Sequence, residues 1–180
     1  MIEVREGERG ERAQSVGSDY VTDRLLARNR IAVRRRSELD KFPRMRLAIV
    51  TCMDCRIDVY EALGLTSGDA NVLRNAGGIV TDDVIRSLVL SQRLLGTREV
   101  ILMHHTDCGL HDLDEERFVD DLAAASGARP PFEFGAFRDV DDDVRRSLAR
   151  VIDSPFVAEK GSVRGFVYDV ATAQVREVRP

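Results

Sequence analysis

Three short apolar segments recur along the middle of the chain, and their pattern limits the fold more than any other feature of the sequence. They are RLAIVTC (46–52), ANVLRNAGG (70–78) and REVILMHH (98–105). Runs of consecutive apolar residues are typical of strands buried on both faces, whereas a half-exposed strand alternates polar and apolar residues. Segments with helical spacing separate the three runs. We therefore predict an α/β fold with a mainly parallel central sheet that is flanked by helices on both faces.

Residues 81–96 predict the clearest of the intervening helices. Thr81 is a good N-cap, Asp82 and Asp83 suit the first turn, and Gly96 marks the end of the helix. The remaining helices are predicted over four other segments, which are 18–39, 59–65, 112–125 and 139–152.

The last part of the chain predicts two further strands, at 162–170 and 173–178, which form a C-terminal hairpin or an edge strand. No internal repeat and no long linker divides the sequence, so we predict one α/β domain over residues 17–180. Residues 1–16 are polar and rich in charges of both signs, and we predict that they form a flexible N-terminal arm.

Composition and charge argue against several classes of protein. No stretch approaches the ~20 consecutive apolar residues of a membrane helix, and the charged first residues do not resemble a secretory signal. The net charge of −4 gives no reason to expect nucleic acid as a partner, and the basic run at 27–36 is interpreted as a solvated or subunit-facing helix. Three cysteines, an odd number, favour reduced thiols and a cytoplasmic location.

Cysteine and histidine are concentrated in two short stretches, TCMDCRID (51–58) and HHTDCG (104–109). Together these hold all three cysteines and two of the three histidines of the chain. Both stretches come at the ends of predicted strands, and the glycines of the second strand segment occupy the corresponding position there. Ligands bind at the carboxyl ends of the strands in parallel sheets, so we expect these segments to converge on one edge.

The spacing selects a subset of these side chains. In extended backbone Cys52, Asp54 and Arg56 share one face, while Cys55 points the other way. His105 and Cys108 are three residues apart, which a tight turn can close around one ion. Two thiolates and one imidazole form a set that suits zinc, and a catalytic zinc site keeps its fourth position for water or substrate.

The fourth position has two interpretations. Asp54 could bind the metal directly and close the site, or Arg56 could hold Asp54 through two hydrogen bonds and leave a water on the metal. A carboxylate that exchanges between the two would switch the site between closed and open forms.

Other interpretations stay open from the residues alone. Cys52 and Cys55 have the spacing of a thioredoxin-type redox pair, and all three cysteines with His105 could form a structural zinc site with four protein ligands. Asp107 is interpreted as a turn residue. The stretch RNAGG (74–78) is either an anion cradle or a place of close packing, and the two common phosphate-binding glycine patterns are absent.

Taken together, CMDCR (52–56), RNAGG and HTDCG (105–109) resemble the β-class carbonic anhydrases, whose pattern is Cys-x-Asp-x-Arg followed by His-x-x-Cys. The resemblance runs from about residue 20 to the C-terminus and is strongest with the short bacterial branch of that family. Cys55 departs from it, because a small residue such as Ala or Ser is expected at that position.

The resemblance implies that Cys52, His105 and Cys108 bind Zn²⁺ and that Asp54 and Arg56 form the catalytic dyad. Zinc-bound hydroxide would attack carbon dioxide and give bicarbonate, which would make the protein a carbonate dehydratase. It also implies a homodimer or homotetramer, in which an N-terminal helix such as 18–39 embraces the partner.

We place the substrate pocket at four consecutive residues, which are Asn75, Ala76, Gly77 and Gly78. Relatives with the same zinc motif hydrolyse carbonyl sulfide or carbon disulfide, and these substrates are the alternative enzymatic prediction. A non-catalytic protein with structural or regulatory zinc is the second alternative.

Overall fold

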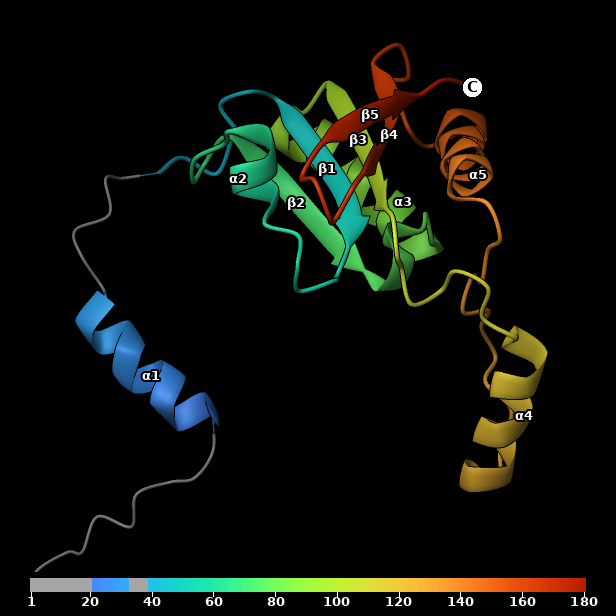
Figure 1. Ribbon diagram of the computed structural model, residues 1–180. Helices are drawn as coiled ribbons and strands as arrows, with labels where there is room; N and C mark the ends of the chain where they lie inside the picture. The colour runs from blue at the N-terminus through green and yellow to red at the C-terminus, as the bar shows by residue number, and fades with distance from the viewer. Residues whose placement is uncertain (1–20, 33–38) are drawn as a thin grey trace, which may run out of the picture. The chain divides into compact units, whose positions relative to one another are not determined.

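A five-stranded sheet lies at the centre of the unit formed by residues 40–180 in the computed structural model, which describes residues 21–32 and 39–180 (Figure 1). The strands are β1 (Leu47–Cys52), β2 (Ala70–Asn75), β3 (Glu99–His105), β4 (Val163–Tyr168) and β5 (Val175–Val178), in the spatial order β2-β1-β3-β4-β5. All neighbours are parallel except β4 and β5, which pair in antiparallel fashion. The predicted mainly parallel sheet with a C-terminal hairpin is confirmed.

Strand β1 runs between β2 and β3, and every one of its six residues is buried. Its register aligns Leu47 with Ala70 on one side and with Glu99 on the other. The three strands consequently end at the same edge, where Cys52 pairs with Asn75. A strand enclosed in this way needs apolar side chains on both faces, which explains the unbroken run in the sequence.

The helices of this unit are α2 (Val59–Leu63), α3 (Asp82–Leu95), α4 (Glu115–Ser126) and α5 (Val140–Asp153), with a short 3₁₀ turn, η1, at Ala76–Gly78. Helix α3 begins and ends as predicted. The Thr81 side chain accepts a hydrogen bond from the Val84 N–H, and Gly96 adopts a left-handed conformation with φ 72°.

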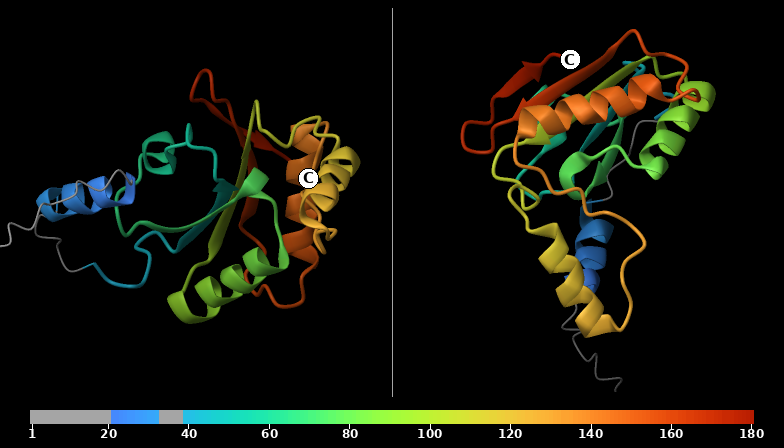
Figure 2. Two further views of the ribbon diagram at one scale, coloured as in Figure 1. Left: turned by 90° about the horizontal axis from the view of Figure 1, so that it is seen from below. Right: turned by 90° about the vertical axis from the view of Figure 1, so that its right-hand side faces the viewer.

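The two faces of the sheet are covered differently. Helices α3 and α5 lie on one face, where Leu88 and Leu148 pack with strand residues such as Val50 and Leu102 in an aliphatic core (Figure 2). In the described part of the chain, the other face carries the short α2 and the loops that follow β1 and β3. Some strand side chains on that face remain half-buried, among them Val72, Ile101 and Phe166.

Helix α1 (Val21–Ala32) belongs to a separate unit, residues 1–39. It lies within the predicted helix 18–39, and its Leu25 and Leu26 side chains are 51% and 58% exposed. The predicted flexible arm, residues 1–16, lies outside the described residues. None of the described helices combines the length and the apolar character that a membrane crossing requires.

Candidate metal centre

Three side chains that can bind a metal meet at the carboxyl edge of the sheet. Cys52 ends β1, His105 ends β3, and Cys108 lies in the loop that follows β3. One ligand atom from each lies within 4.8 Å of the other two, and all three residues are buried. Zinc bonds of about 2.3 Å to sulfur and 2.0 Å to nitrogen fit inside such a triangle. The predicted convergence of the two sequence stretches is thus present in the structure.

The ring of His105 is oriented so that one nitrogen remains free for a metal. Its Nδ1 lies 2.8 Å from the carbonyl oxygen of Thr106, which assigns the N–H to that nitrogen. Nε2 is buried and has no hydrogen-bond partner among the described residues. A histidine that donates through one nitrogen and presents the lone pair of the other has the arrangement typical of a metal ligand.

The two thiols lie close enough to share a proton. The hydrogen bond between them lowers the pKa of Cys52 and raises that of Cys108. Burial opposes the shift at Cys52, while hydrogen bonds from the backbone N–H groups of Asp54 and Gly77 support its thiolate. The backbone N–H of Leu110 supports the sulfur of Cys108 in the same way. Backbone donors therefore favour negative sulfur at both positions, as a divalent cation requires.

Asp54 is held by Arg56 in this structure. Asp54 Oδ1 lies 3.0 Å from Arg56 Nε, and Oδ2 lies 2.7 Å from Nη2. These contacts, together with the Arg56 backbone N–H, hold the pKa of Asp54 well below its usual range. Asp54 Oδ2 is also 3.9 Å from His105 Nε2, so the carboxylate lies beside the cluster. Of the two predicted arrangements, the structure has the one in which Asp54 pairs with arginine.

The glycine segment supports Cys52 closely. Gly78 has φ 71°, and a Cβ at this position would lie 2.8 Å from the backbone nitrogen of Cys52. Gly77 has φ 77°, and a Cβ there would lie 2.6 Å from the Leu110 side chain. The Asn75 side chain donates to the Ile79 carbonyl oxygen at 2.9 Å. The close-packing interpretation of RNAGG therefore holds, and the anion that Gly77 faces is the sulfur of Cys52.

Cys55 is exposed and does not belong to the three-residue group. A zinc site closed by all three cysteines and His105 is therefore not assembled here. The extended backbone predicted through Arg56 is absent, because β1 ends at Cys52 and a turn follows in which the Ile57 N–H donates to the Asp54 carbonyl oxygen. Cys52 and Cys55 are both free thiols, and only Cys52 is buried.

Two residues contribute to the site that sequence reasoning did not assign to it. Arg74, in β2, donates from Nε to the Cys52 carbonyl oxygen at 2.9 Å and from Nη2 to that of Asp54 at 2.6 Å. Asp107 is a turn residue with φ 54°, as interpreted, but its carboxylate also binds Arg56. The one available signal for Arg74 is its place near the end of a strand that neighbours β1.

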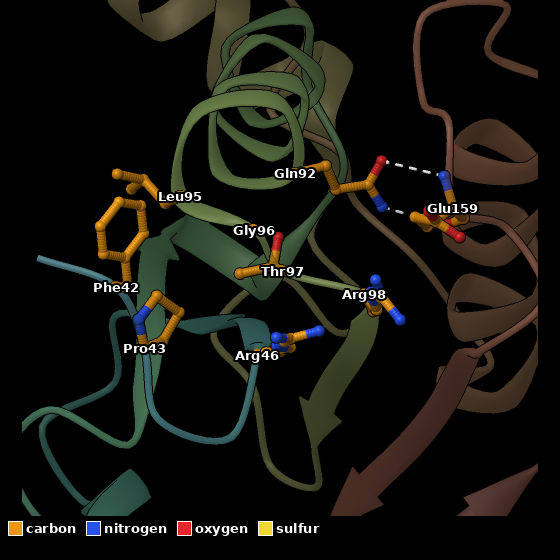
Figure 3. Close-up of a pocket in the computed structure, with 9 residues that line it drawn as sticks. All are labelled: Phe42, Pro43, Arg46, Gln92, Leu95, Gly96, Thr97, Arg98 and Glu159. Atoms are coloured by element: carbon orange, nitrogen blue, oxygen red, sulfur yellow. Dashed lines mark hydrogen bonds between the residues drawn. The ribbon is translucent and has the colours of Figure 1, made fainter.

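A separate cavity lies near the amino ends of β1 and β3 and shares no residue with the cluster (Figure 3). Its volume is about 390 Å³, and Arg46 and Arg98 are among its lining residues. Gln92 closes one side through hydrogen bonds to the backbone N–H and carbonyl oxygen of Glu159. The chemistry-bearing residues of the sequence thus gather at the opposite edge.

Comparison with known proteins shows that the chain is similar to carbonic anhydrases. The family described as carbonic anhydrase matches residues 47–123. Beta-carbonic anhydrase 1 of Mycobacterium tuberculosis is 50% identical over 89% of this chain and 99% of its own. The crystal structure of a carbonic anhydrase from Streptococcus mutans superposes with a TM-score of 0.83 at 43% identity, covering 88% of this chain and 97% of that one. A carbon disulfide hydrolase of Saccharolobus solfataricus is 35% identical over 89% of each chain.

Proposed function

The chain belongs to the β-carbonic anhydrase family, and on that premise we propose that it catalyses the reversible hydration of carbon dioxide to bicarbonate. It is then a carbonate dehydratase, a lyase, with zinc as its cofactor. The observation that carries the proposal is the buried Cys52–His105–Cys108 group with an ionised Asp54 beside it.

These three residues would hold the metal, since the free Nε2 of His105 and the two supported sulfurs form a donor set that suits zinc. Zinc supplies a Lewis acid that lowers the pKa of a coordinated water towards neutrality. All three ligands are buried, so bulk water is excluded from one side of the centre. Asp54 Oδ2, 3.9 Å from His105 Nε2, is the carboxylate oxygen that would contact a water bound beside these residues.

Asp54 and Arg56 orient the nucleophile. The lowered pKa of Asp54 keeps its carboxylate ionised at neutral pH, so that it can only accept hydrogen bonds. An O–H group of the attacking nucleophile that donates to Asp54 has its lone pair turned away from the carboxylate and towards the substrate. Arg56 keeps the carboxylate in place through two hydrogen bonds, which is a positioning task that requires a rigid fork.

We assign the substrate pocket to Asn75, Ala76, Gly77 and Gly78. This segment lies against Cys52: a Cβ on Gly78 would lie 2.8 Å from the Cys52 backbone nitrogen, and the Gly77 backbone N–H supports the Cys52 sulfur. The buried Oδ1 of Asn75 has no partner among the described residues and supports a polar role for this segment.

Carbon disulfide is the second candidate substrate, because a carbon disulfide hydrolase is similar over most of the chain. Its hydrolysis needs the same nucleophile and differs in the shape of the approach to the centre. The identity to that relative is 35%, against 50% to a carbonic anhydrase, so carbon dioxide ranks first.

We propose a homo-oligomer, a homodimer or a homotetramer. Its support is the exposed Leu25 and Leu26 of α1 and the half-buried side chains on the sheet face opposite α3 and α5. A second copy of the chain would cover such surfaces. The cytoplasm is the proposed location, since thiolate ligands depend on a reducing compartment.

Stopped-flow measurement of carbon dioxide hydration on zinc-loaded protein, from neutral to alkaline pH, tests the function. We expect fast turnover that rises with pH and scales with bound zinc. Bound zinc without carbon dioxide turnover at any pH contradicts the proposal, and the same protein is then assayed with carbon disulfide and carbonyl sulfide.

The Arg56→Ala variant tests the dyad. We expect the fold and the zinc content to be retained, while kcat/KM falls by roughly 100-fold. Wild-type activity in this variant would remove Asp54 and Arg56 from the mechanism, even if the zinc chemistry stands.

A further inference from the structure

We infer that Asp107 is a positioning residue, which holds the Nη1–Nη2 edge of the Arg56 guanidinium beside the Nε–Nη2 edge that binds Asp54, and so fixes the dyad relative to the metal ligands. The inference rests on the proposed function of the dyad. It assigns a task to a residue whose sequence position indicates only a turn.

Two contacts join Asp107 to Arg56. Arg56 Nη1 lies 2.6 Å from the Asp107 carboxylate, and Nη2 donates to the Asp107 backbone carbonyl oxygen at 2.8 Å. On its other edge, the guanidinium donates from Nε and Nη2 to the carboxylate of Asp54. A guanidinium has five N–H groups in a fixed plane, and four of them are engaged here. Arg56 is therefore clamped on both edges.

The second clamp matters because Arg56 is otherwise exposed to solvent. The Arg56 side chain is 44% exposed and the Asp107 side chain 78%, and an isolated ion pair at such a site holds a long side chain weakly. The Asp107 backbone carbonyl adds a second acceptor, which makes the contact two-pointed. A planar group with a single carboxylate partner can pivot about that partner. Contacts on the adjacent Nη1–Nη2 edge oppose that rotation, so the orientation of Asp54 becomes fixed as well.

The backbone of Asp107 makes this geometry available. Asp107 has φ 54°, a left-handed conformation that aspartate adopts more readily than most residues. That turn directs both the carboxylate and the carbonyl oxygen towards Arg56. Asp107 also lies between His105 and Cys108, so the segment that carries two metal ligands sets the position of the arginine. The position of the dyad is thereby linked to the position of the metal ligands.

The Asp107→Gly substitution isolates the carboxylate. Glycine accepts a positive φ without strain and keeps the carbonyl oxygen, so only the contact at 2.6 Å is removed. The matched control is Asp112→Gly, because Asp112 lies in the same loop with φ 56° and its carboxylate contacts His111 rather than Arg56. Asp107→Asn, which restores an acceptor oxygen without the charge, is the conservative rescue.

We expect kcat of zinc-loaded, full-length Asp107→Gly to fall by roughly 10-fold, with KM, zinc content and Tm close to those of wild type. Asp112→Gly should retain wild-type kinetics, and Asp107→Asn should recover most of the loss. In an Arg56→Ala background, Asp107→Gly should change kcat by less than about twofold, since Asp107 acts only through Arg56.

Unchanged kcat in Asp107→Gly, or an undiminished loss in the Arg56→Ala background, overturns the inference. A loss of zinc from Asp107→Gly does so too, because it would show that the carboxylate stabilises the loop of the ligands instead. These outcomes differ from failure of the proposed function. If wild type has no activity on carbon dioxide, the proposed function is contradicted. If Arg56→Ala is fully active, the catalytic role of Asp54 and Arg56 is contradicted. If Arg56→Ala is impaired while Asp107→Gly is not, only the positioning role of Asp107 is contradicted.

Discussion

Two adjacent histidines at the end of β3 face opposite sides of the sheet, and both are 1% exposed. His104 points towards α5, where its Nδ1 lies 2.9 Å from Asp143 Oδ2. His105 points towards the two thiols and Asp54. Since successive residues of a strand point in opposite directions, one dipeptide contributes to two different environments.

The difference between these environments is how their charges are balanced. On the α5 face, the protein supplies both signs, because Asp143 also binds Arg146 at 2.8 Å. On the other face, two sulfurs and an ionised carboxylate surround a nitrogen without a partner. The first arrangement has an acidic and a basic partner, although His104 Nε2 is also buried without a hydrogen-bond partner among the described residues. The second gathers sulfur, nitrogen and carboxylate oxygen, which together suit a cation. An unpaired buried nitrogen is present on both faces, so the functional signal is the group of metal-binding atoms around His105.

The largest expected effect is loss of metal on the His105 face. Cys52→Ser removes a thiolate ligand. Loss of a residue that only hydrogen-bonds to a ligand costs up to ~100-fold in metal affinity, so we expect a larger fall in zinc affinity here. Metal analysis after dialysis against a chelator measures this loss, and hydration activity should disappear with the zinc. A variant that keeps its zinc would mean that the polar cluster at His105 is not the metal centre.

The His104 face should respond in stability rather than in metal content. Asp143→Asn weakens a buried charge pair, and we expect it to cost roughly 3 kcal/mol in urea unfolding, with zinc content unchanged. The matched control is Asp142→Asn on the same helix, since Asp142 is 70% exposed and likewise pairs with an arginine three residues on. That control should cost less than about 1 kcal/mol.

The same variant makes a prediction about pH. Burial raises the pKa of Asp143, but the contacts with His104 and Arg146 outweigh burial, so the net shift is downwards. The contribution to stability is then present above the unfolded-state pKa of about 3.9 and is lost as pH falls through the lower folded-state value. The stability difference between wild type and Asp143→Asn should therefore shrink in strongly acidic solution. A difference that grows there would reverse the assigned sign.

Two glycines allow the comparison to be sharpened by adding a methyl group to each face. Gly78→Ala would place Cβ 2.8 Å from the Cys52 backbone nitrogen, in a left-handed conformation, and should reduce both stability and zinc affinity. Gly165→Ala, on β4, would press on Val144 and lies 2.9 Å from Leu148, both of α5. We expect each to cost roughly 1–3 kcal/mol in chemical unfolding. Zinc titration should distinguish the two variants, since Gly165→Ala should bind zinc with wild-type affinity. Equal zinc affinities in the two variants would contradict the assignment of the metal site to one face of the sheet.

The smallest effect is expected at Cys55. Its thiol is exposed and lies outside the metal group, so Cys55→Ser should leave zinc content and activity at wild-type levels and change stability by less than about 0.5 kcal/mol. Loss of zinc in this variant would instead revive a structural site with four protein ligands.

Local patterns in the sequence were sufficient for much of this architecture. Apolar runs indicated the strands, and Thr81 and Gly96 marked the ends of α3. The rule that parallel strands end at one edge then brought Cys52, His105 and Cys108 together. Each of these inferences depends on residues close in sequence or on a general property of parallel sheets.

Only the tertiary structure decided which partner each polar side chain takes. Arg74 reaches the Cys52 carbonyl 22 residues away, and Arg56 reaches Asp107 across 51 residues. The partner of His104 lies on α5, and the second acceptor of Arg56 lies in the loop after β3. Hydrogen bonds act over a few ångströms, so their pairing follows from the final packing of elements and loops. Periodicity specifies the direction in which a side chain points, but it does not specify which residue that side chain contacts.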